Sequence, residues 1–347
     1  MKGIILHGGH GTRLRPLTHT GPKQLLQIAN KPMSEYCLDS IKDTGITEIA
    51  IIIGGIGAKK VVDYYGTGER FGVKISYIKQ DEPKGIAHAI NLCKEFVGDE
   101  KFLVFLGDNI IRKSISDFKK KFQESDSDAT ILLCEVENPS RFGIAEVSND
   151  NIIKILEKPK KPKSNLAVTG IYFLTPKIFD IIKYLKPSWR NELEITDALQ
   201  KLLENKNKIS FEIITDYWKD TGTPEDIINA NSQILAGNKQ VSIGKGTIIE
   251  KDAKISKNSI IGENCSISNG VTIGPNTSIG DNVVIEANKQ NDDQIKIENS
   301  IIMSECLIQG SITIRDSIIS SKCHIKKNKN ESEKKIFLLG EGTKISF

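Results

Sequence analysis

A glycine-rich segment close to the start of the chain has the composition of a phosphate-binding loop. The segment, Leu6-His-Gly-Gly-His-Gly-Thr-Arg-Leu14, overlaps the end of a short apolar run, Lys2–His7. Its glycines let the backbone approach a ligand closely and direct N–H groups at phosphate oxygens. The segment lacks the Gly-Lys-Ser/Thr ending of a P-loop and the complete dinucleotide fingerprint, and taken alone it could also be a tight turn.

Two cations and one carboxylate extend this chemistry. Arg13 and Lys23 follow the glycines, and side chains of these types neutralise triphosphate charge and stabilise a pentavalent transition state. Asp108 comes directly after the apolar run Phe102–Leu106. A carboxylate in that place can bind Mg²⁺, which prefers oxygen ligands; an aspartate that caps a helix is the alternative.

The elements around these residues alternate in type up to about residue 236. Short runs rich in Ile, Val, Leu and Phe predict buried strands at Lys2–His7, Glu48–Ile53, Lys74–Ile78 and Phe102–Leu106. Helical spacing between them predicts helices at Met33–Thr44, Lys59–Tyr65 and Ile86–Phe96. This alternation indicates an α/β, Rossmann-like domain with a mostly parallel, mixed sheet, whose ligands lie beyond the carboxyl ends of the strands.

A six-residue rhythm replaces this pattern after about residue 240. Units such as Ser259-Ile-Ile-Gly-Glu-Asn and Thr277-Ser-Ile-Gly-Asp-Asn carry an aliphatic residue at the third place and a turn residue at the end. Such hexads predict a left-handed parallel β-helix. We expect a loop at Ala287–Gln294 and a closing strand within Ile336–Phe347. The predicted domains are therefore 1–238 and 239–347.

The N-terminal segments resemble the signature GxGTRLxPLTxxxPKxLxP of the sugar-1-phosphate nucleotidyltransferases. This chain departs from the signature at His7, where a small residue is usual, and at Gln27, where proline is usual. The resemblance implies a Rossmann-like catalytic domain that binds a nucleoside triphosphate. The residues it assigns to the nucleotide are Leu6, Gly8, Gly9, Gly11, Thr12, Arg13, Gln80, Gly85 and Asp108.

Two further segments match elements of the same family. Gln80-Asp-Glu-Pro-Lys-Gly-Ile-Ala-His88 resembles its base-reading segment, in which the Gln side chain and the Gly backbone bond the Watson–Crick edge of a pyrimidine. An ordinary loop before a helix is the alternative. Asp216-Tyr-Trp-Lys-Asp-Thr-Gly-Thr223 resembles the W-x-D-T-G-T element, so Asp220 is expected to be the second metal ligand beside Asp108.

The sugar-phosphate side is also assigned by resemblance. The segments concerned are Arg141–Ile144, Leu156–Pro159, Ala167–Tyr172 and Arg190–Asp197, the last with Asn191 where the family has glycine. The implied sugar-phosphate residues are Asn109, Gly143, Glu157, Lys158, Val168 and Arg190. For Arg190, a structural ion pair with a neighbour is the alternative.

The repeat domain and the ending Phe337-Leu-Leu-Gly-Glu-Gly resemble the long-form glucose-1-phosphate thymidylyltransferases within this family. The resemblance implies Mg²⁺-dependent transfer from dTTP to glucose 1-phosphate, by in-line attack of the sugar-phosphate oxygen on the α-phosphorus. The implied catalytic residues are Arg13, Lys23, Asp108, Lys158 and Asp220.

Three other functions are alternatives. A uridylyltransferase would use UTP instead of dTTP, and the two bases differ by only one methyl group. A bifunctional enzyme would also acetylate an amino sugar. Acyltransferases on such scaffolds generally use a histidine base, and His324 is the only histidine after His88. An inert scaffold is disfavoured because both cations and both aspartates are present.

Composition and charge also indicate which other partners the protein has. The formal net charge of +4 is too small to indicate a nucleic-acid partner, and no run approaches the ~18 apolar residues of a membrane span. The sequence also shows no signal-peptide pattern, so a cytoplasmic protein is expected. The flat faces of a β-helix suit symmetric association, which predicts a homo-oligomer, a trimer or tetramer.

Overall fold

The computed structural model describes residues 1–9, 11–236, 241–287, 294–326 and 334–346. The chain divides into two compact units. The first comprises Met1–His10 with Met33–Asp220, and the second comprises Gly11–Pro32 with Thr221–Phe347. The expected domain boundary at 238/239 and most of the expected loop Ala287–Gln294 lie outside the described residues.

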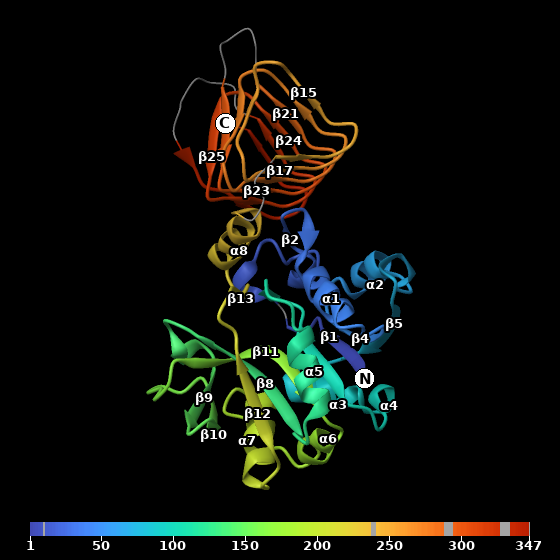
Figure 1. The fold of residues 1–347 in the computed structure, drawn as a ribbon. Coiled ribbons are helices and arrows are strands. Elements are labelled where there is room, and N and C mark those ends of the chain that lie inside the picture. The colour runs from blue at the N-terminus through green and yellow to red at the C-terminus, as the bar shows by residue number, and fades with distance from the viewer. Residues whose placement is uncertain (10, 237–240, 288–293, 327–333, 347) are drawn as a thin grey trace. The chain divides into compact units, whose positions relative to one another are not determined.

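The first unit is built on a mixed sheet with strand order β12-β8-β11-β6-β1-β4-β5, from whose β11 the hairpin β9–β10 branches (Figure 1). Its central strands β1, β4, β5 and β6 are mutually parallel, whereas β11 runs antiparallel to β6. The strands of this sheet are β1 (Lys2–Leu6), β4 (Glu48–Ile53), β5 (Lys74–Lys79), β6 (Phe102–Leu106), β8 (Ala129–Glu135), β9 (Gly143–Ser148), β10 (Asn151–Glu157), β11 (Leu166–Leu174) and β12 (Ile209–Ile213). The Rossmann-like mixed sheet expected from the sequence is confirmed.

Helices cover both faces of this sheet. On β1, Gly3 faces Ile41 of one helix, while Ile4 packs in the same core cluster as Ile90 of another. The helices of the first unit are α1 (Met33–Asp43), α2 (Ala58–Tyr65), α3 (Ile86–Leu92), α4 (Lys94–Val97), α5 (Ser116–Glu124), α6 (Lys177–Ile182) and α7 (Ile195–Glu204). The single helix expected at Ile86–Phe96 is wrong, because the Cys93 N–H bonds the Ile90 carbonyl in a tighter turn and splits it into α3 and α4.

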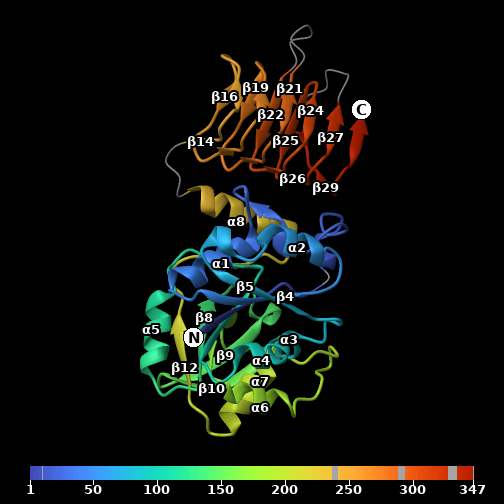
Figure 2. The ribbon, with the colours of Figure 1, turned by 90° about the vertical axis from the view of Figure 1, so that its right-hand side faces the viewer.

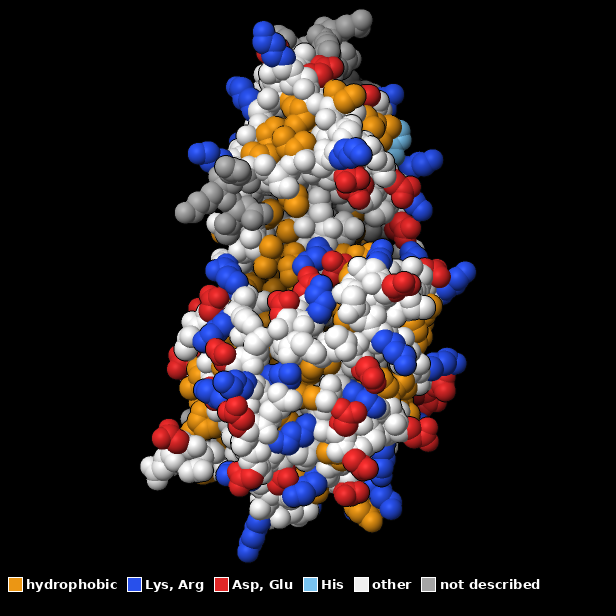
Figure 3. Space-filling model, turned by 45° about the vertical axis from the view of Figure 1, so that its right-hand side comes forward, with side chains coloured by type: hydrophobic (Ala, Val, Ile, Leu, Met, Phe, Trp, Pro, Cys, Tyr) orange, Lys and Arg blue, Asp and Glu red, His pale blue; other side chains and the backbone are white. Residues whose placement is uncertain are grey.

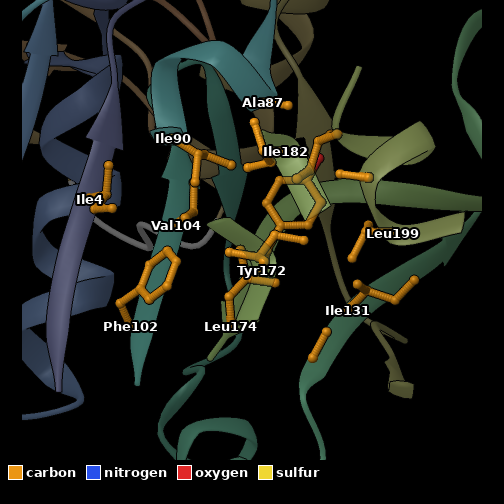
Figure 4. Packing of buried hydrophobic residues seen from close by; sticks show 14 of the residues in the cluster. Ile4, Ala87, Ile90, Phe102, Val104, Ile131, Tyr172, Leu174, Ile182 and Leu199 are labelled. Carbon is orange, nitrogen blue, oxygen red and sulfur yellow. The ribbon is translucent and has the colours of Figure 1, made fainter. Parts of the chain in front are cut away.

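The core between the sheet and α3, α6 and α7 is aliphatic and aromatic. Figure 4 shows Val104 and Leu174 from neighbouring strands packed among helix residues such as Ile182 and Leu199. Phe102 stacks on Phe179 with ring centroids 5.4 Å apart. Burial of this kind stabilises each side chain by about 1.5–3 kcal/mol. The strands are therefore fixed from within, and their ends form a rigid edge.

The second unit contains a parallel β-helix, as the hexads predicted. Three sheets form its faces, and their strands pair in parallel from coil to coil (Figure 2). One interior column aligns Ile261, Ile279, Ile302 and Ile319, all at most 1% exposed. The strands are β14 (Ser242–Ile243), β15 (Ile248–Ile249), β16 (Lys254–Ile255), β17 (Ile260–Ile261), β18 (Ser266–Ile267), β19 (Val271–Ile273), β20 (Ser278–Ile279), β21 (Val284–Glu286), β22 (Ile295–Glu298), β23 (Ile301–Ile302), β24 (Leu307–Gln309), β25 (Ile312–Arg315), β26 (Ile318–Ile319), β27 (His324–Lys326), β28 (Lys334–Lys335), β29 (Leu338–Leu339) and β30 (Lys344–Ser346).

The expected closing strand within Ile336–Phe347 is two short strands instead. β29 adds to the sheet that begins with β14, and β30 adds to the sheet that begins with β15. A β-helix coil must turn at each corner, and Gly342, with φ of 75°, lies at the turn between them.

A hairpin and a helix complete the second unit. The hairpin β2 (Gln27–Ile28) and β3 (Lys31–Pro32) and the helix α8 (Pro224–Ala236) meet at Asn231, which is fully buried. The Asn231 amide accepts a hydrogen bond from the Ala29 N–H (2.9 Å) and donates one to the Asn276 carbonyl (3.0 Å). The helix thus ties the hairpin to the β-helix.

Candidate active site

Four sequence positions lie in a row along one edge of the first unit's sheet. Gln80, Gly54, Gly8 and Asp108 each follow the carboxyl end of a strand, namely β5, β4, β1 and β6. Because these strands are adjacent in that order and parallel, their carboxyl ends share one edge. This edge is where open α/β sheets bind ligands.

The Gln80 end of the row is tightly built. Gln80 is 6% exposed, its N–H bonds the Ile53 carbonyl (2.8 Å), and its Nε2 lies 3.0 Å from His88 Nδ1. A Cβ on Gly8 would lie 3.6 Å from Gln80 Oε1, so the carboxamide borders the glycine turn. The side chain expected to read the base is thus buried, bonded and beside the expected phosphate loop.

Gly85 is required by its surroundings. Its φ is 102°, and a Cβ there would meet the Leu193 carbonyl oxygen at 2.4 Å. Two backbone hydrogen bonds, Leu193 N–H to Lys84 and Ala87 N–H to Leu193, hold the segment. The Gly85 backbone is therefore fixed next to the start of α3.

The two aspartates are brought together by a short ladder. β7 (Asn109–Ile111) pairs antiparallel with β13 (Trp218–Asp220), and Asp220 stands opposite Asn109, the residue after Asp108. Asn109 Nδ2 also donates to Asp108 Oδ1 (3.0 Å). Carboxylates at two such positions would fit Mg²⁺, which usually takes one or two from the protein and the rest of its ligands from phosphate and water. Among the described residues no group of three His, Cys, Asp or Glu gathers to hold an ion.

Asn109 itself holds this ladder in place. Its side chain is 3% exposed, and its Oδ1 accepts hydrogen bonds from Trp218 Nε1 (2.8 Å) and from the Gly170 N–H (3.1 Å). The amide that was assigned to the sugar phosphate therefore has protein partners on both its atoms. Sequence reasoning missed the part played by Trp218, although the tryptophan of the W-x-D-T-G-T element was the available signal.

The sugar-side residues gather at the β9–β10 hairpin. Gly143 pairs directly with Glu157, and a Cβ on Gly143 would lie 2.5 Å from Thr196 Cγ2 and 3.7 Å from Val168 Cβ. Thr196 Oγ1 donates to Glu157 Oε2 (2.9 Å). Since β9 and β6 both pair with β11, this group continues the row past Asp108.

Lys158 and Arg190 flank the Glu157 carboxylate. Lys158 has a φ of 42°, a strained value for a lysine, and its N–H bonds the Phe142 carbonyl (3.1 Å). Its Nζ lies 3.3 Å from Glu157 Oε1. Arg190 contacts the carboxylates of Glu157 (3.5 Å), Glu194 (3.2 Å) and Glu192 (3.1 Å). Three carboxylate partners favour the structural ion-pair interpretation of Arg190.

The burial of the Glu194 carboxylate explains why the Arg190 cation lies beside it. Burial, and then the neighbouring Glu157, raise the pKa of Glu194, and Arg190 opposes that shift. The next residue, Asn191, has a φ of 59°. Asparagine tolerates this left-handed conformation better than most residues, which accounts for its place where the family signature has glycine.

The remaining predicted residues belong to the second unit. Gly11 (φ 58°) begins a turn of 3-10 helix at Thr12–Leu14, and its carbonyl accepts a bond from Thr18 Oγ1 (2.8 Å). The Arg13 guanidinium lies against Gly222, where a Cβ would meet Nη2 at 3.1 Å. Lys23 starts a second 3-10 turn, Lys23–Leu25. Arg13 thus contacts the glycine of the Asp-Thr-Gly-Thr segment.

His7 is buried behind the glycine turn. It is 2% exposed, its ring meets Tyr65 edge-on at 5.9 Å, and neither ring nitrogen has a hydrogen-bond partner among the residues that the structure describes. Burial lowers the pKa of His7 to about 3, although Asp108 opposes the shift. The ring is therefore neutral at pH 7 and poorly placed to act as a base.

A cavity of about 700 Å³ lies within the second unit. Its lining residues are Pro224, Glu225, Ile228, Asn229, Ser232, Asn276, Asn299, Asp316, Ile318, Ile336, Phe337 and Leu338. Two carboxylates and no lysine or arginine stand among these lining residues, so the cavity does not suit a triphosphate.

Fold and site together define a nucleotide-binding α/β protein that carries a parallel β-helix. The chain belongs to the nucleotidyl transferase family, whose model matches residues 2–237. The repeat region matches two further models, the bacterial transferase hexapeptide (six repeats) at residues 240–275 and the GMPPB C-terminal domain at residues 267–346.

Named relatives cover most of the chain. It is 48% identical over 254 residues to the low-salt glycan biosynthesis nucleotidyltransferase Agl11 of Haloferax volcanii, covering 73% of this chain and 70% of that protein. A glucose-1-phosphate thymidylyltransferase of Streptomyces antibioticus is 44% identical over 237 residues, with 68% of this chain and 66% of that protein covered. The UTP--glucose-1-phosphate uridylyltransferase AglF of Haloferax volcanii is 37% identical over 247 residues, with 70% and 100% covered.

Solved structures show the same fold. A Bacillus anthracis protein assigned as a glucose-1-phosphate thymidylyltransferase, in complex with sucrose, is 43% identical with a TM-score of 0.64, covering 67% of this chain and 94% of that one. A UDP-glucose pyrophosphorylase complexed with UDP-glucose is 29% identical with a TM-score of 0.62, covering 68% and 98%.

The surface charges and the helices bear on contacts with nucleic acids and membranes. Basic and acidic side chains are interspersed over the face drawn in Figure 3. Within the described part of the chain, no helix has the length and apolar character needed to span a bilayer.

Proposed function

We propose that the protein transfers a nucleotidyl group from dTTP to glucose 1-phosphate, forming dTDP-glucose and pyrophosphate. The observation that supports this most is the continuous row along one sheet edge, from Gln80 through Asp108 to Glu157. In this proposal a base-reading amide, a pair of carboxylates and a hydroxyl acceptor follow one another in the order in which a nucleoside diphosphate sugar presents its parts. The similarity to named thymidylyltransferases supports the choice of base.

The base and nucleoside occupy the Gln80 end in this proposal. Gln80 and the Gly85 backbone bond the Watson–Crick edge of the pyrimidine. Leu6, Gly8 and Gly9 line the nucleotide through their backbone, and Gly11 and Thr12 cover the phosphates. Glycines suit this place because a ligand can approach the backbone closely.

The reaction needs little proton transfer in this proposal. A sugar phosphate is already largely a dianion at pH 7, so its oxygen can attack the α-phosphorus in line and release pyrophosphate. The main obstacle is repulsion between two polyanions. Lys158 positions the attacking phosphate, and Arg13 and Lys23 stabilise the triphosphate and the leaving pyrophosphate.

The sugar is held at the hairpin end in this proposal. Glu157 accepts hydrogen bonds from sugar hydroxyls, and Gly143 and Val168 contact the ring through backbone atoms. Arg190 orients Glu157, with which it is paired at 3.5 Å. Asn109 acts on the same side by holding Asp108.

Asp108 and Asp220 are the residues that would hold Mg²⁺. When bound, the ion neutralises charge on the phosphates as pyrophosphate leaves. Asp108 directly precedes β7 and Asp220 ends β13, and the pairing of Asp220 with Asn109 supports a shared site for the two carboxylates. The chemistry belongs to residues 1–238 in this proposal, and residues 239–347 serve self-association.

Pyrophosphate release tests the proposal. Purified protein is supplied with glucose 1-phosphate, Mg²⁺ and one of dTTP, UTP, dCTP, ATP or GTP. We expect release with dTTP, weaker release with UTP, and none without the sugar phosphate. Equal release with the purine nucleotides, or release without sugar phosphate, would contradict it.

A uridylyltransferase is the second candidate, and the full-length match to AglF favours it. Thymine adds one methyl group to uracil, which is worth only ~1–3 kcal/mol in an apolar pocket. The ratio of kcat/KM for dTTP over UTP decides between the two. A ratio below one would make UTP the substrate and leave the rest of the proposal unchanged.

A further inference from the structure

The polar contact that holds the Gln80 side chain has a direction. Gln80 Nε2 lies 3.0 Å from His88 Nδ1. A carboxamide nitrogen can only donate hydrogen bonds, so His88 Nδ1 must accept, and the histidine proton lies on Nε2. Oε1 then occupies the other end of the amide, next to Gly8, where a Cβ would come within 3.6 Å of it.

The backbone leaves Gln80 little freedom to reorient. The Gln80 N–H bonds the Ile53 carbonyl (2.8 Å), and a Cβ on Gly54 would lie only 2.3 Å from the Gln80 carbonyl oxygen. The side chain is 6% exposed, so water cannot freely satisfy either amide atom. The remaining choice is which end of the amide faces His88.

The environment of His88 favours a neutral ring. Burial, and then the nearby Lys84 ammonium, lower the pKa of His88, while Glu82 opposes the shift. A neutral ring retains one nitrogen that accepts. His88 receives the Gln80 N–H in the tautomer that carries its proton on Nε2, and the reversed amide would require that proton to move to Nδ1.

Amide direction matters because pyrimidines differ at one edge. Thymine and uracil carry an N3–H donor beside a carbonyl acceptor, whereas cytosine carries an N3 acceptor beside an amino donor. A carboxamide that presents Oε1 to N3–H, and its second Nε2–H to the carbonyl, matches the first pattern. The reversed carboxamide matches the second.

We propose that His88 is a positioning residue for base selection: by accepting from Gln80 Nε2 it fixes the carboxamide in the direction that admits thymine or uracil and rejects cytosine. This inference rests on the proposed function, because it assumes that Gln80 meets the base. A mismatched buried pair typically costs enough to shift selectivity by about 10- to 100-fold.

The test compares two pyrimidines in three variants. The quantity measured is the ratio of kcat/KM for dTTP over dCTP, at saturating glucose 1-phosphate. We expect His88→Leu, which removes the acceptor, to lower this ratio about 10- to 100-fold. His88→Asn can offer a carbonyl acceptor and should keep the ratio within about threefold of wild type. His324→Leu, the matched substitution in the β-helix, should leave it unchanged.

Binding measurements keep the test independent of turnover and of folding losses. Calorimetric Kd values for dTDP and dCDP give the same ratio without catalysis, and thermal unfolding shows which variants are folded. If His88→Leu is unstable, His88→Ala takes its place.

The outcomes are distinct. Equal losses for both pyrimidines in His88→Leu and His88→Ala, with an unchanged ratio, would overturn the positioning role and leave a merely structural one. A wild-type ratio near one would overturn it as well. Failure of the wild type to bind dTDP, dCDP or UDP would instead defeat the proposed function.

Discussion

At the scale of single residues, Asp108 is the side chain on which most of the proposed chemistry depends. It follows β6, accepts from Asn109 Nδ2 at 3.0 Å and directly precedes Asn109, which pairs with Asp220 across the ladder. We expect Asp108→Asn to lower kcat by about 10²–10³-fold, because charge stabilisation at such sites is worth that much. Steady-state pyrophosphate release measures the loss.

The control for that variant is Asp117→Asn. Asp117 is an exposed aspartate in the first turn of α5. It should keep wild-type turnover, and both variants should melt close to the wild-type temperature. Near-normal turnover in Asp108→Asn would contradict the assignment.

His7 makes a separate prediction about acid stability. Its pKa is about 3 in the folded protein and 6.5 in an ordinary environment, so the unfolded chain binds the proton more readily. Protonation of His7 therefore has no effect on the free energy of unfolding above pH 6.5. As the pH drops from 6.5 towards 3, that free energy falls by at most about 1.4 kcal/mol per pH unit. Urea unfolding of His7→Leu at pH 5 and pH 8 should show a smaller difference than wild type.

Exposed His19 supplies the comparison for this experiment. His19→Leu should keep the wild-type difference between the two pH values. If His7→Leu keeps it too, the buried ring is not the source of acid sensitivity.

Sequence patterns predicted many of these residues but not the side chains that they contact. The segments holding Gln80, Asp108, Glu157 and Asp220 were found by motif, and strand ends explain why several share one edge. Motifs could not show that Arg190 faces three carboxylates, because Glu157 lies 33 positions away. Contacts between residues this far apart in the sequence form only when the sheet has folded.

At the scale of elements, apolar runs predicted the central strands closely. Glu48–Ile53 and Phe102–Leu106 match β4 and β6 at both ends, since continuous aliphatic runs with polar boundaries leave little ambiguity. The break at Cys93 and the corner at Gly342 were missed. Both depend on local turns that apolar periodicity does not report.

The ladder between β7 and β13 carries the element-scale prediction. Trp218 Nε1 donates to Asn109 Oδ1 at 2.8 Å, so Trp218→Phe leaves that buried acceptor with one partner fewer. We expect a loss of about 1–3 kcal/mol in unfolding free energy and a lower kcat, because the aspartate pair is held less firmly. Denaturant melts and pyrophosphate release test both effects.

The other tryptophan is the matched control. Trp189 is 82% exposed, so Trp189→Phe should change neither stability nor turnover appreciably. Unchanged stability in Trp218→Phe would show that the indole contact does not hold the ladder.

At the scale of the whole molecule, hexads predicted the β-helix because each coil repeats one simple rule of burial. The attachment of the hairpin could not be predicted. Ser278 Oγ donates to Asn30 Oδ1 at 2.6 Å across 248 positions, a contact that no local pattern encodes.

The β-helix also motivates a prediction of self-association. Ile243 and Ile248, on the first coil, are 50% and 66% exposed, and apolar side chains on a sheet edge favour contact with another chain. We expect a trimer or tetramer by light scattering coupled to gel filtration. A monomer across the micromolar range would contradict the expectation.

The most direct measurement is a crystal structure with dTDP-glucose bound. In the proposed complex, one sheet edge holds base, phosphates and sugar in sequence. We predict thymine within hydrogen-bonding distance of Gln80 and a glucose hydroxyl on Glu157, with the diphosphate near Asp108 between them. Nucleotide bound away from this edge, or bound with its sugar at Gln80, would contradict this prediction.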